Sequence, residues 1–286
     1  MANKRFILTA EGLGWSKDIN KAILEGYSGD ILKSACIIAT GKAFDDALAT
    51  VVSTNPDLGV GLSLNLTRGQ SLCEDLKTLT DSKDNFCNSF FKLLIKSYNP
   101  KEKEFLEQVE REFRRQIEKT LSKTRITHLS SVDDVHAIPK IFEIVCRLAK
   151  EYGIKYVRTH FEKPHFIPDL HKHFKLKYFS NLLKSAFLGG LTVLNESTVH
   201  KYELKTNDYL VGIIYHSMMS SLSVVYGVMA VRYDNVLIES SINPCRYEDG
   251  TIDNNFNEYL ITKNKKLKEK IEKLGYEITN YVEKEA

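Results

Sequence analysis

FILTAEGLGWS, from Phe6 to Ser16, is a short apolar run that ends on Glu11 and is followed at once by a Gly-Leu-Gly turn. The run predicts a buried strand, and the glycines predict the loop that leaves it. Glu11 is the first carboxylate of the chain, and it stands where this strand ends. A glutamate at such a position is either a surface residue or part of a site, and both interpretations are open at this point.

Beyond this strand, patterns of strands alternate with patterns of helices. Helices are predicted at 18–30, 42–53, 101–123, 140–153 and 264–275, and further strands at 34–40, 58–66, 126–132, 154–161, 189–197, 235–244 and 276–282. This alternation predicts an α/β fold with a parallel sheet and helices outside it. The number of strands favours a closed or nearly closed sheet, that is, a distorted, TIM-barrel-like (β/α) barrel.

The segment 101–123 is highly charged, but its apolar residues recur every four positions. They are Phe105, Val109, Phe113, Ile117 and Leu121, a spacing typical of an amphipathic helix with a solvated charged face. The chain shows no linker rich in Pro, Gly or Ser. Residues 1–286 are therefore predicted to form a single domain, with a helical insertion near 95–125.

The composition, 43% hydrophobic and 27% charged over 286 residues, is that of an ordinary globular protein. A net charge of +3 is too small to indicate a nucleic-acid partner. No run of about twenty apolar residues could span a membrane, and the N-terminus does not have the pattern of a signal peptide. The five cysteines are scattered without a CxxC pair, which favours reduced thiols in a cytoplasmic protein over a zinc site or disulfides.

Polar side chains gather at the predicted strand ends, where (β/α) barrels carry their reactive groups. Carboxylates, amides and imidazoles dominate the set, and such groups suit a polar ligand that carries hydroxyl groups. The set comprises Glu11, Ser63, Asn65, Asp133, Asp134, His136, Arg158, His160, Glu162, Asn195, Glu196, Glu239 and Asn243.

Four segments, in order along the chain, resemble the YdjC-like carbohydrate deacetylase family. Residues 9–48 (TAEGLGWS…FDDAL) are similar to its Ala-Asp-Asp-Phe-Gly turn, helix and second strand, and residues 55–72 (NPDLGVGLSLNLTRGQSL) to its Gly-Leu-His-Leu-Asn-Leu-Thr strand. Residues 126–158 (ITHLSSVDDVHAIP…KYVR) follow its His-rich strand, helix and Arg-ending strand. IESSINPCRYEDG, residues 238–250, lies where the family has a His-Pro-Gly turn.

This resemblance implies a distorted (β/α) barrel, often a homodimer, that hydrolyses the N-acetyl group of an amino sugar or a chito-oligosaccharide. In the family, one aspartate and two histidines hold a divalent metal. The metal activates a water molecule, and a neighbouring aspartate serves as the base.

At the positions that match these ligands, the chain carries other residues. The aspartate pair is Glu11 and Gly12 here, so the first carboxylate is one methylene longer and the second has no side chain. The histidine of Gly-Leu-His-Leu is Ser63, and the first two histidines of the third segment are Val132 and Asp134. Because a catalytic metal site needs about three anionic or imidazole ligands, we expect neither a bound metal nor another cofactor.

Two further family positions complete the predicted site. The last histidine of the third segment is retained as His136, and the histidine of the His-Pro-Gly turn is Asn243. Glu11 and His136 are therefore the predicted catalytic residues, although His136 also fits a packed, hydrogen-bonded side chain. The predicted substrate-binding residues are Ser63, Asn65, Asp134, Arg158, Glu162, Glu196, Glu239 and Asn243.

The sequence leaves three functions open for a small sugar or oligosaccharide ligand. The first is deacetylase-like hydrolysis of an N-acetylated sugar or a related polyhydroxylated ligand without the usual metal chemistry. The second is non-catalytic sugar binding by a regulatory pseudoenzyme. The third is a metal-free glycosidase, in which two strand-end carboxylates act as a pair. The candidates for that pair are Glu11, Glu162, Glu196 and Glu239, and an Asn before the Glu, as at 195–196, also occurs in some barrel glycosidases.

Two local features each have two interpretations. Arg158 either holds a substrate oxygen or pairs with Glu162. The histidines of THFEKPHFIPDLHKHF, residues 159–174, suggest metal binding, but the intervening prolines and lysines favour a surface loop. These histidines are His160, His165, His171 and His173.

Overall fold

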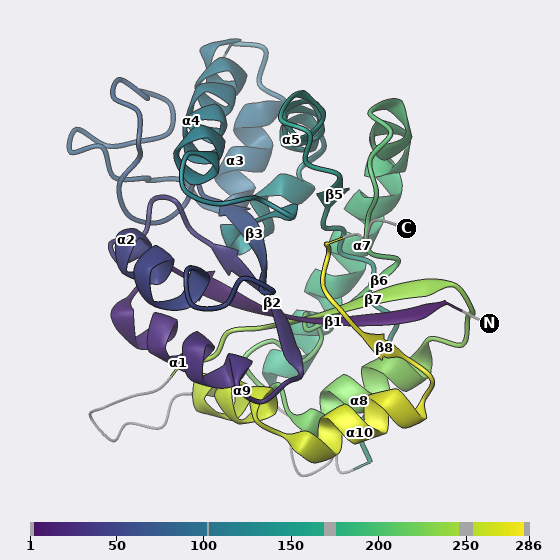
Figure 1. The fold of residues 1–286 in the computed structure, drawn as a ribbon. Coiled ribbons are helices and arrows are strands. Elements are labelled where there is room, and N and C mark those ends of the chain that lie inside the picture. Colours follow the sequence, from purple (N-terminus) through teal and green to yellow (C-terminus); the bar gives the residue numbers. More distant parts are fainter. Residues whose placement is uncertain (1–2, 102, 169–175, 246–253, 283–286) are drawn as a thin grey trace.

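The computed structural model describes residues 3–101, 103–168, 176–245 and 254–282. Eight parallel strands of this part of the chain form one sheet in the order β5-β4-β3-β2-β1-β7-β6, with β8 beside β1 (Figure 1). The strands are β1 (Lys4–Leu13), β2 (Leu32–Ile37), β3 (Gly59–Leu64), β4 (His128–Ser131), β5 (Tyr156–Val157), β6 (Tyr209–Val211), β7 (Val236–Ile242) and β8 (Glu277–Ile278).

The two edges of the sheet come back to each other. Tyr156 in β5 forms a parallel bridge to Lys205, just before β6. The N–H of Val157 donates to the carbonyl of Lys205 at 3.0 Å, and the N–H of Leu210 donates to the carbonyl of Phe161 at 2.9 Å. The sheet therefore curls into a distorted (β/α) barrel, and the single-domain α/β fold predicted from the sequence is confirmed.

Helices surround the curled sheet; in the view of Figure 1, α1, α8, α9 and α10 lie below it, α4 and α5 lie above it, and the long α7 extends from the level of the sheet to the upper right. Their bounds are α1 (Lys17–Tyr27), α2 (Phe44–Ala47), α3 (Phe90–Ser97), α4 (Lys103–Leu121), α5 (Pro139–Glu151), α7 (Leu176–Lys201), α8 (Ser221–Ala230), α9 (Asn254–Thr262) and α10 (Lys265–Lys273). Among the described residues, no helix combines the length and the apolar character that crossing a membrane requires.

Local signals account for the helices that the sequence predicts. Ser16 caps α1 by accepting a hydrogen bond from the N–H of Ile19. Pro139 opens α5, where its missing N–H is not needed. In α4, the residues that repeat every four positions from Phe105 to Ile117 are fully buried, so the amphipathic face predicted at 101–123 packs onto the barrel.

The strand predicted at 189–197 is wrong, because the segment lies inside the long helix α7. Thr192 and Val193 favour strands, but Leu188, Leu191 and Asn195 are buried at spacings of three and four residues, which is the period of a helix. The strand that pairs with β7 here is β6. The sequence pattern does not predict β6, α3, α8 or α9.

Candidate functional site

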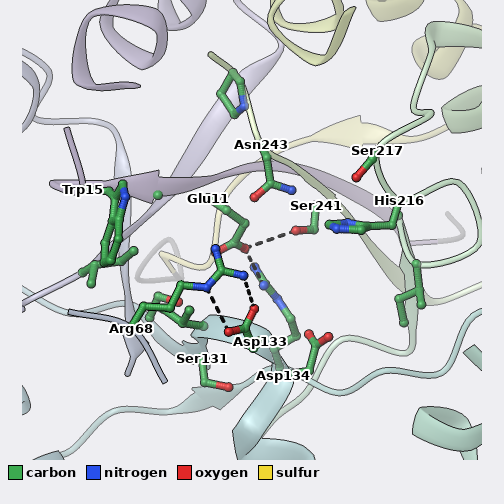
Figure 2. Close-up of a pocket in the computed structure, with 18 of the residues that line it drawn as sticks. Glu11, Trp15, Arg68, Ser131, Asp133, Asp134, His216, Ser217, Ser241 and Asn243 are labelled. Atoms are coloured by element: carbon green, nitrogen blue, oxygen red, sulfur yellow. Dashed lines mark hydrogen bonds and ion pairs between the residues drawn. The ribbon is translucent and has the colours of Figure 1, made fainter. Parts of the chain in front are cut away.

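A cavity of about 370 Å³ opens at the carboxyl ends of the strands (Figure 2). Its wall includes Glu11 from β1, Ser63 from β3, Ser131 from β4 and Ser241 from β7. In (β/α) barrels this end of the sheet carries the ligand and the reactive groups. We call this space the polar cavity.

The first carboxylate of the chain belongs to a buried ion-pair cluster at the floor of the polar cavity. Arg158 donates from Nη1 to Glu11 Oε1 at 2.5 Å. The same guanidinium donates from Nε and Nη2 to the two carboxylate oxygens of Glu239, at 2.9 and 2.5 Å. The side chains of Arg158, Glu11 and Glu239 are 5%, 15% and 0% exposed. Glu11 is therefore part of a largely buried ion-pair cluster and not a surface residue.

The two carboxylates of this cluster differ in how easily they take up a proton. Burial raises the pKa of Glu11 above its ordinary value, and the charge of Arg158 only partly opposes this. Burial acts on Glu239 in the same direction, but the charge and the two hydrogen bonds of Arg158 lower its pKa to about 2. Tyr281 also donates to Glu239, at 2.6 Å. Burial beside one shared guanidinium thus shifts the pKa values of Glu11 and Glu239 in opposite directions.

A strained turn after β4 brings two aspartates to the rim of the cavity. Asp133 and Asp134 both have left-handed backbone angles, with φ of 53° and 59°, which is uncommon for residues other than glycine. Asp133 accepts from Arg68 Nε and Nη2 at 3.0 and 2.5 Å and from the Thr67 hydroxyl at 2.8 Å (Figure 2). These bonds hold the turn in place, and strain of this kind concentrates at functional sites.

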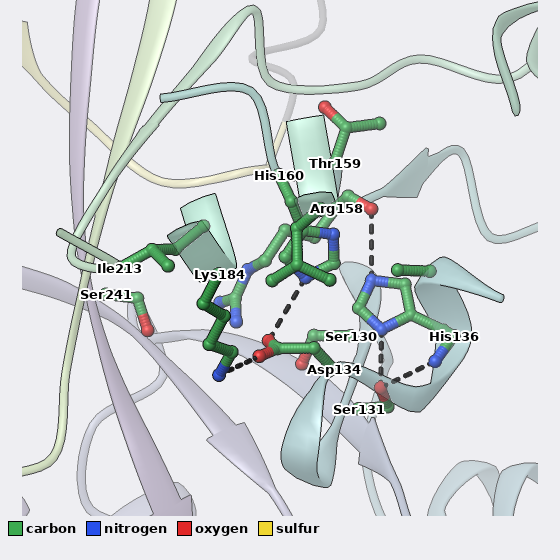
Figure 3. Close-up of polar contacts among 12 residues, drawn as sticks. Ser130, Ser131, Asp134, His136, Arg158, Thr159, His160, Lys184, Ile213 and Ser241 are labelled. Atoms are coloured by element: carbon green, nitrogen blue, oxygen red, sulfur yellow. Dashed lines mark hydrogen bonds and ion pairs between the residues drawn. The ribbon is translucent and has the colours of Figure 1, made fainter. Parts of the chain in front are cut away.

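Asp134 is held by the side chains of Lys184 and His160 (Figure 3). It accepts from Lys184 Nζ at 2.7 Å and lies 3.1 Å from His160 Nε2. Burial alone would raise the pKa of Asp134, but the bonds and charges of His160 and Lys184 bring it well below its ordinary value. Asp134 is therefore a fixed anion on the wall of the cavity.

His136 lies behind the wall rather than on it. Its ring is fully buried, with Nδ1 2.5 Å from the Ser131 hydroxyl and Nε2 3.1 Å from the carbonyl of Arg158 (Figure 3). Burial lowers the pKa of His136 well below its ordinary value. The packed, hydrogen-bonded interpretation describes this neutral ring, which supports the backbone that carries Arg158.

Two of the predicted substrate-binding residues, Glu162 and Asn65, form hydrogen bonds to other groups of the protein. The Glu162 carboxylate accepts from the N–H groups of Gly212, Ile213 and Ile214 at 2.8 to 3.0 Å, and burial raises its pKa to about 7. Of the two interpretations of Arg158, the pairing with Glu162 is wrong, because Arg158 binds Glu11 and Glu239 instead. Asn65 holds its own turn by bonding Thr67 and Arg68.

Because residues 189–197 lie in the helix α7, two more of the predicted residues lie away from the strand ends. Asn195 is buried and donates to the carbonyl of Ala137 at 2.8 Å. Glu196 is 72% exposed on the same helix, 3.9 Å from His200. Neither follows a strand. Of the four glutamates considered as a glycosidase pair, Glu11 alone lines the polar cavity.

In the described part of the histidine-rich segment, residues 159–168, the backbone forms no helix or strand, and Phe161 and Phe166 are exposed. His160 and His165 are buried, because His160 bonds Asp134 and His165 packs on the ring of Tyr215. His171 and His173 lie outside the described residues. Ser63, Asn243 and Asp134 do line the polar cavity, as predicted for strand-end residues.

Sequence reasoning misses part of the wall, namely Trp15, Arg68, Lys184, His216, Ser217 and Ser241. Ser241 could have been found, since it lies two residues after Glu239 and alternate residues of a strand share a face. Its hydroxyl donates to Glu11 Oε1 at 3.2 Å. Lys184 could not, because it comes from the helix that the pattern misassigns.

The residues present do not fit the divalent metal that the family resemblance implies. The matching positions Gly12, Ser63 and Val132 line the cavity without a strong ligand, while Glu11 and Asp134 already bind cationic side chains. In the part of the chain that the structure describes, no three His, Cys, Asp or Glu side chains are grouped to hold a metal ion.

Comparisons with known proteins agree on the family and the fold. A model of the YdjC-like protein family matches residues 5–237. A carbohydrate deacetylase of Clostridium beijerinckii is 36% identical over 151 residues, and carbohydrate deacetylase 1 of Listeria innocua is 36% identical over 171 residues. These matches cover 52% and 58% of this chain, and 58% and 66% of those proteins.

Among solved structures, one of a proposed cellobiose-phosphate cleavage protein from Enterococcus faecalis V583 superposes with a TM-score of 0.76 and 19% identity. The superposition covers 98% of each chain. At this identity the likeness concerns the fold. The barrel is thus shared over its whole length, while the sequence likeness to the two deacetylases spans less than two thirds of either protein.

Proposed function

Because the chain belongs to the YdjC-like protein family, we propose that it is a deacetylase-like hydrolase of an N-acetylated sugar or a related polyhydroxylated ligand. The ligand lies in the polar cavity, and Glu11 rather than a metal-bound water carries the proton transfer. The observation that carries this proposal is the position of Glu11, a carboxylate of raised pKa on the cavity wall beside a buried arginine.

The surroundings of Glu11 suit a general base. Arg158 and Ser241 both donate to its Oε1. Within the described part of the chain no hydrogen bond engages Oε2, which leaves this oxygen for a water or a ligand hydroxyl. A base with a pKa raised toward neutrality takes and returns a proton efficiently.

The reaction follows from this placement. Glu11 removes a proton from a water molecule while the oxygen of that water forms a bond to the acetyl carbonyl carbon. The carbon–nitrogen bond then breaks, and the same proton returns from Glu11 to the departing amine, which yields acetate and a free amino sugar. Lys184 and Arg158 supply positive charge at the cavity wall, where the carbonyl oxygen becomes negative.

A second candidate function, non-catalytic sugar binding, is favoured by a specific observation. Glu11 and Asp134 are each neutralised by a cation, and the positions Gly12, Ser63 and Val132 offer no metal ligand of the usual kind. Hydroxyls and amides remain on the wall at Ser63, Ser241 and Asn243, and such groups recognise a sugar without transforming it.

Acetate release from N-acetylglucosamine and its dimer, with and without a chelator, separates these candidates. We expect turnover that persists in the chelator and falls about a hundredfold or more in Glu11→Gln, as for loss of a general base. Glu107→Gln, an exposed glutamate on α4, is the matched control and keeps full activity.

The other outcomes decide between the alternatives. Turnover that stops on metal removal and returns with Zn²⁺ would overturn the metal-independent mechanism. Calorimetric binding of the sugar without turnover would leave the non-catalytic function. If the sugar neither binds nor reacts, both candidates are contradicted.

A further inference from the structure

A second, larger hollow lies next to the polar cavity, with a volume of about 930 Å³. We call it the apolar groove; its apolar lining residues are Phe86, Phe90, Phe91, Leu183, Phe187 and Leu188. Phe91 in α3 is 64% exposed, and Leu183 and Phe187 in α7 are 72% and 40% exposed. An exposed apolar surface of this kind marks a contact site more often than chance.

The aromatic wall of the groove is already assembled. The ring of Phe90 lies 5.6 Å from that of Phe91 and 6.1 Å from that of Phe187, both edge to face. Phe91 and Phe187 are 6.2 Å apart. Edge-to-face rings at such distances stabilise one another, so a ligand group meets a preformed surface.

The groove and the polar cavity adjoin each other. Arg68, Asp133 and Lys184 line both of them, and the rim between them consists of the Arg68–Asp133 ion pair (Figure 2) and the Lys184 side chain that reaches Asp134 (Figure 3). A molecule bound in the cavity reaches the groove by passing this rim. The two spaces therefore share one wall, formed by Arg68, Asp133 and Lys184.

The polar groups of the groove are mostly engaged already. The amide of Asn88 donates to the carbonyls of Thr78 and Leu79, and the Ser180 hydroxyl donates to the carbonyl of Lys177. A second sugar ring in the groove would find few protein groups free to bond its hydroxyls, so it would gain little over hydration in water. An apolar chain has no such requirement.

We propose that the ligand is a glycoconjugate, with its sugar in the polar cavity and an alkyl group attached to that sugar in the apolar groove. This inference rests on the proposed function and names its substrate class. The ligand crosses the rim between Arg68 and Lys184, and α7 contributes to both ends of the site.

Isothermal titration calorimetry with two probes tests this. The probes are N-acetylglucosamine and octyl N-acetyl-β-glucosaminide, the latter below its micelle concentration. We expect the octyl glycoside to bind at least tenfold more tightly. Leu183→Ser and Phe187→Ser, made separately, reduce this gain severalfold and leave the affinity for N-acetylglucosamine unchanged. Leu194→Ser is the matched control, since Leu194 is 66% exposed on the same helix outside the groove.

Several results would overturn the inference. They are equal affinity for the two probes, a gain that survives both groove variants, and an equal gain from N,N′-diacetylchitobiose that the groove variants abolish. A dimer that Leu183→Ser dissociates would assign the groove to a second copy of the chain. If N-acetylglucosamine itself does not bind, the proposed function fails first, and the inference fails with it.

Discussion

The floor and the rim of the polar cavity are both made of ion pairs, yet they differ in depth. At the floor, Arg158 binds Glu11 and Glu239 with almost no exposure to water. At the rim, Arg68 and Asp133 form an equally short pair with side chains that are 59% and 34% exposed. The ion pairs at the floor and at the rim have the same N–O distance, but their side chains differ in exposure to water.

This difference in depth bears on how much each ion pair contributes to stability. Water screens an exposed pair, so its net contribution to stability is small. A buried charge that loses its partner has no water to replace it, so the loss is large. We therefore expect the ion pairs at the floor to contribute more to the free energy of unfolding than the pair at the rim.

Glu239→Gln should have the largest effect, because it removes the buried partner with two hydrogen bonds to Arg158. We expect the free energy of unfolding to fall by about 3–5 kcal/mol, measured by urea denaturation at neutral pH. Glu107→Gln on the exposed face of α4 should change it by less than about 0.5 kcal/mol. A change in Glu239→Gln as small as this control would contradict the distinction between floor and rim.

The contribution of Glu239 should also depend on pH. Its pKa is lowered from 4.5 to about 2 in the folded protein, so its stabilising effect is present above pH 4.5 and is lost as the pH falls through 2. Such a shift corresponds to about 3 kcal/mol. The difference in unfolding free energy between the wild type and Glu239→Gln should therefore shrink when urea denaturation is repeated at pH 3. A constant difference would show that Glu239 is not ionised in the way described.

Arg68→Ala should have the smallest effect, because its pair with Asp133 is exposed. We expect the free energy of unfolding to change by about 0–1 kcal/mol, with a further decrease of that difference in high salt. Denaturation at low and high salt measures both. A loss comparable to that of Glu239→Gln would mean that the rim contributes as much to stability as the floor.

Much of this arrangement could be predicted from local patterns. Glu11 and Arg158 each follow an apolar run that forms a strand, and parallel strands bring their carboxyl ends together. Their meeting therefore follows from the sequence. The choice of partner does not: Glu239 lies in one predicted strand and Glu162 follows another, and the assembled sheet decides which of them faces Arg158.

The sequence pattern does not predict the parts of the site that come from α7. GGLTVLNES contains the glycines and β-branched residues of a strand, and its helical burial becomes visible only when α7 packs on α5 and the barrel. With that helix misassigned, Lys184 could not be placed and Glu196 was placed wrongly. Short apolar runs carry this ambiguity in general.

We propose that Arg158 at the floor of the polar cavity, and not a divalent ion, is the cation beside Glu11. Titration of the purified protein with Zn²⁺ by calorimetry tests it most directly. We expect no stoichiometric binding at micromolar zinc. One zinc per chain, with binding abolished by Glu11→Gln or Asp134→Asn but not by Glu107→Gln, would contradict it.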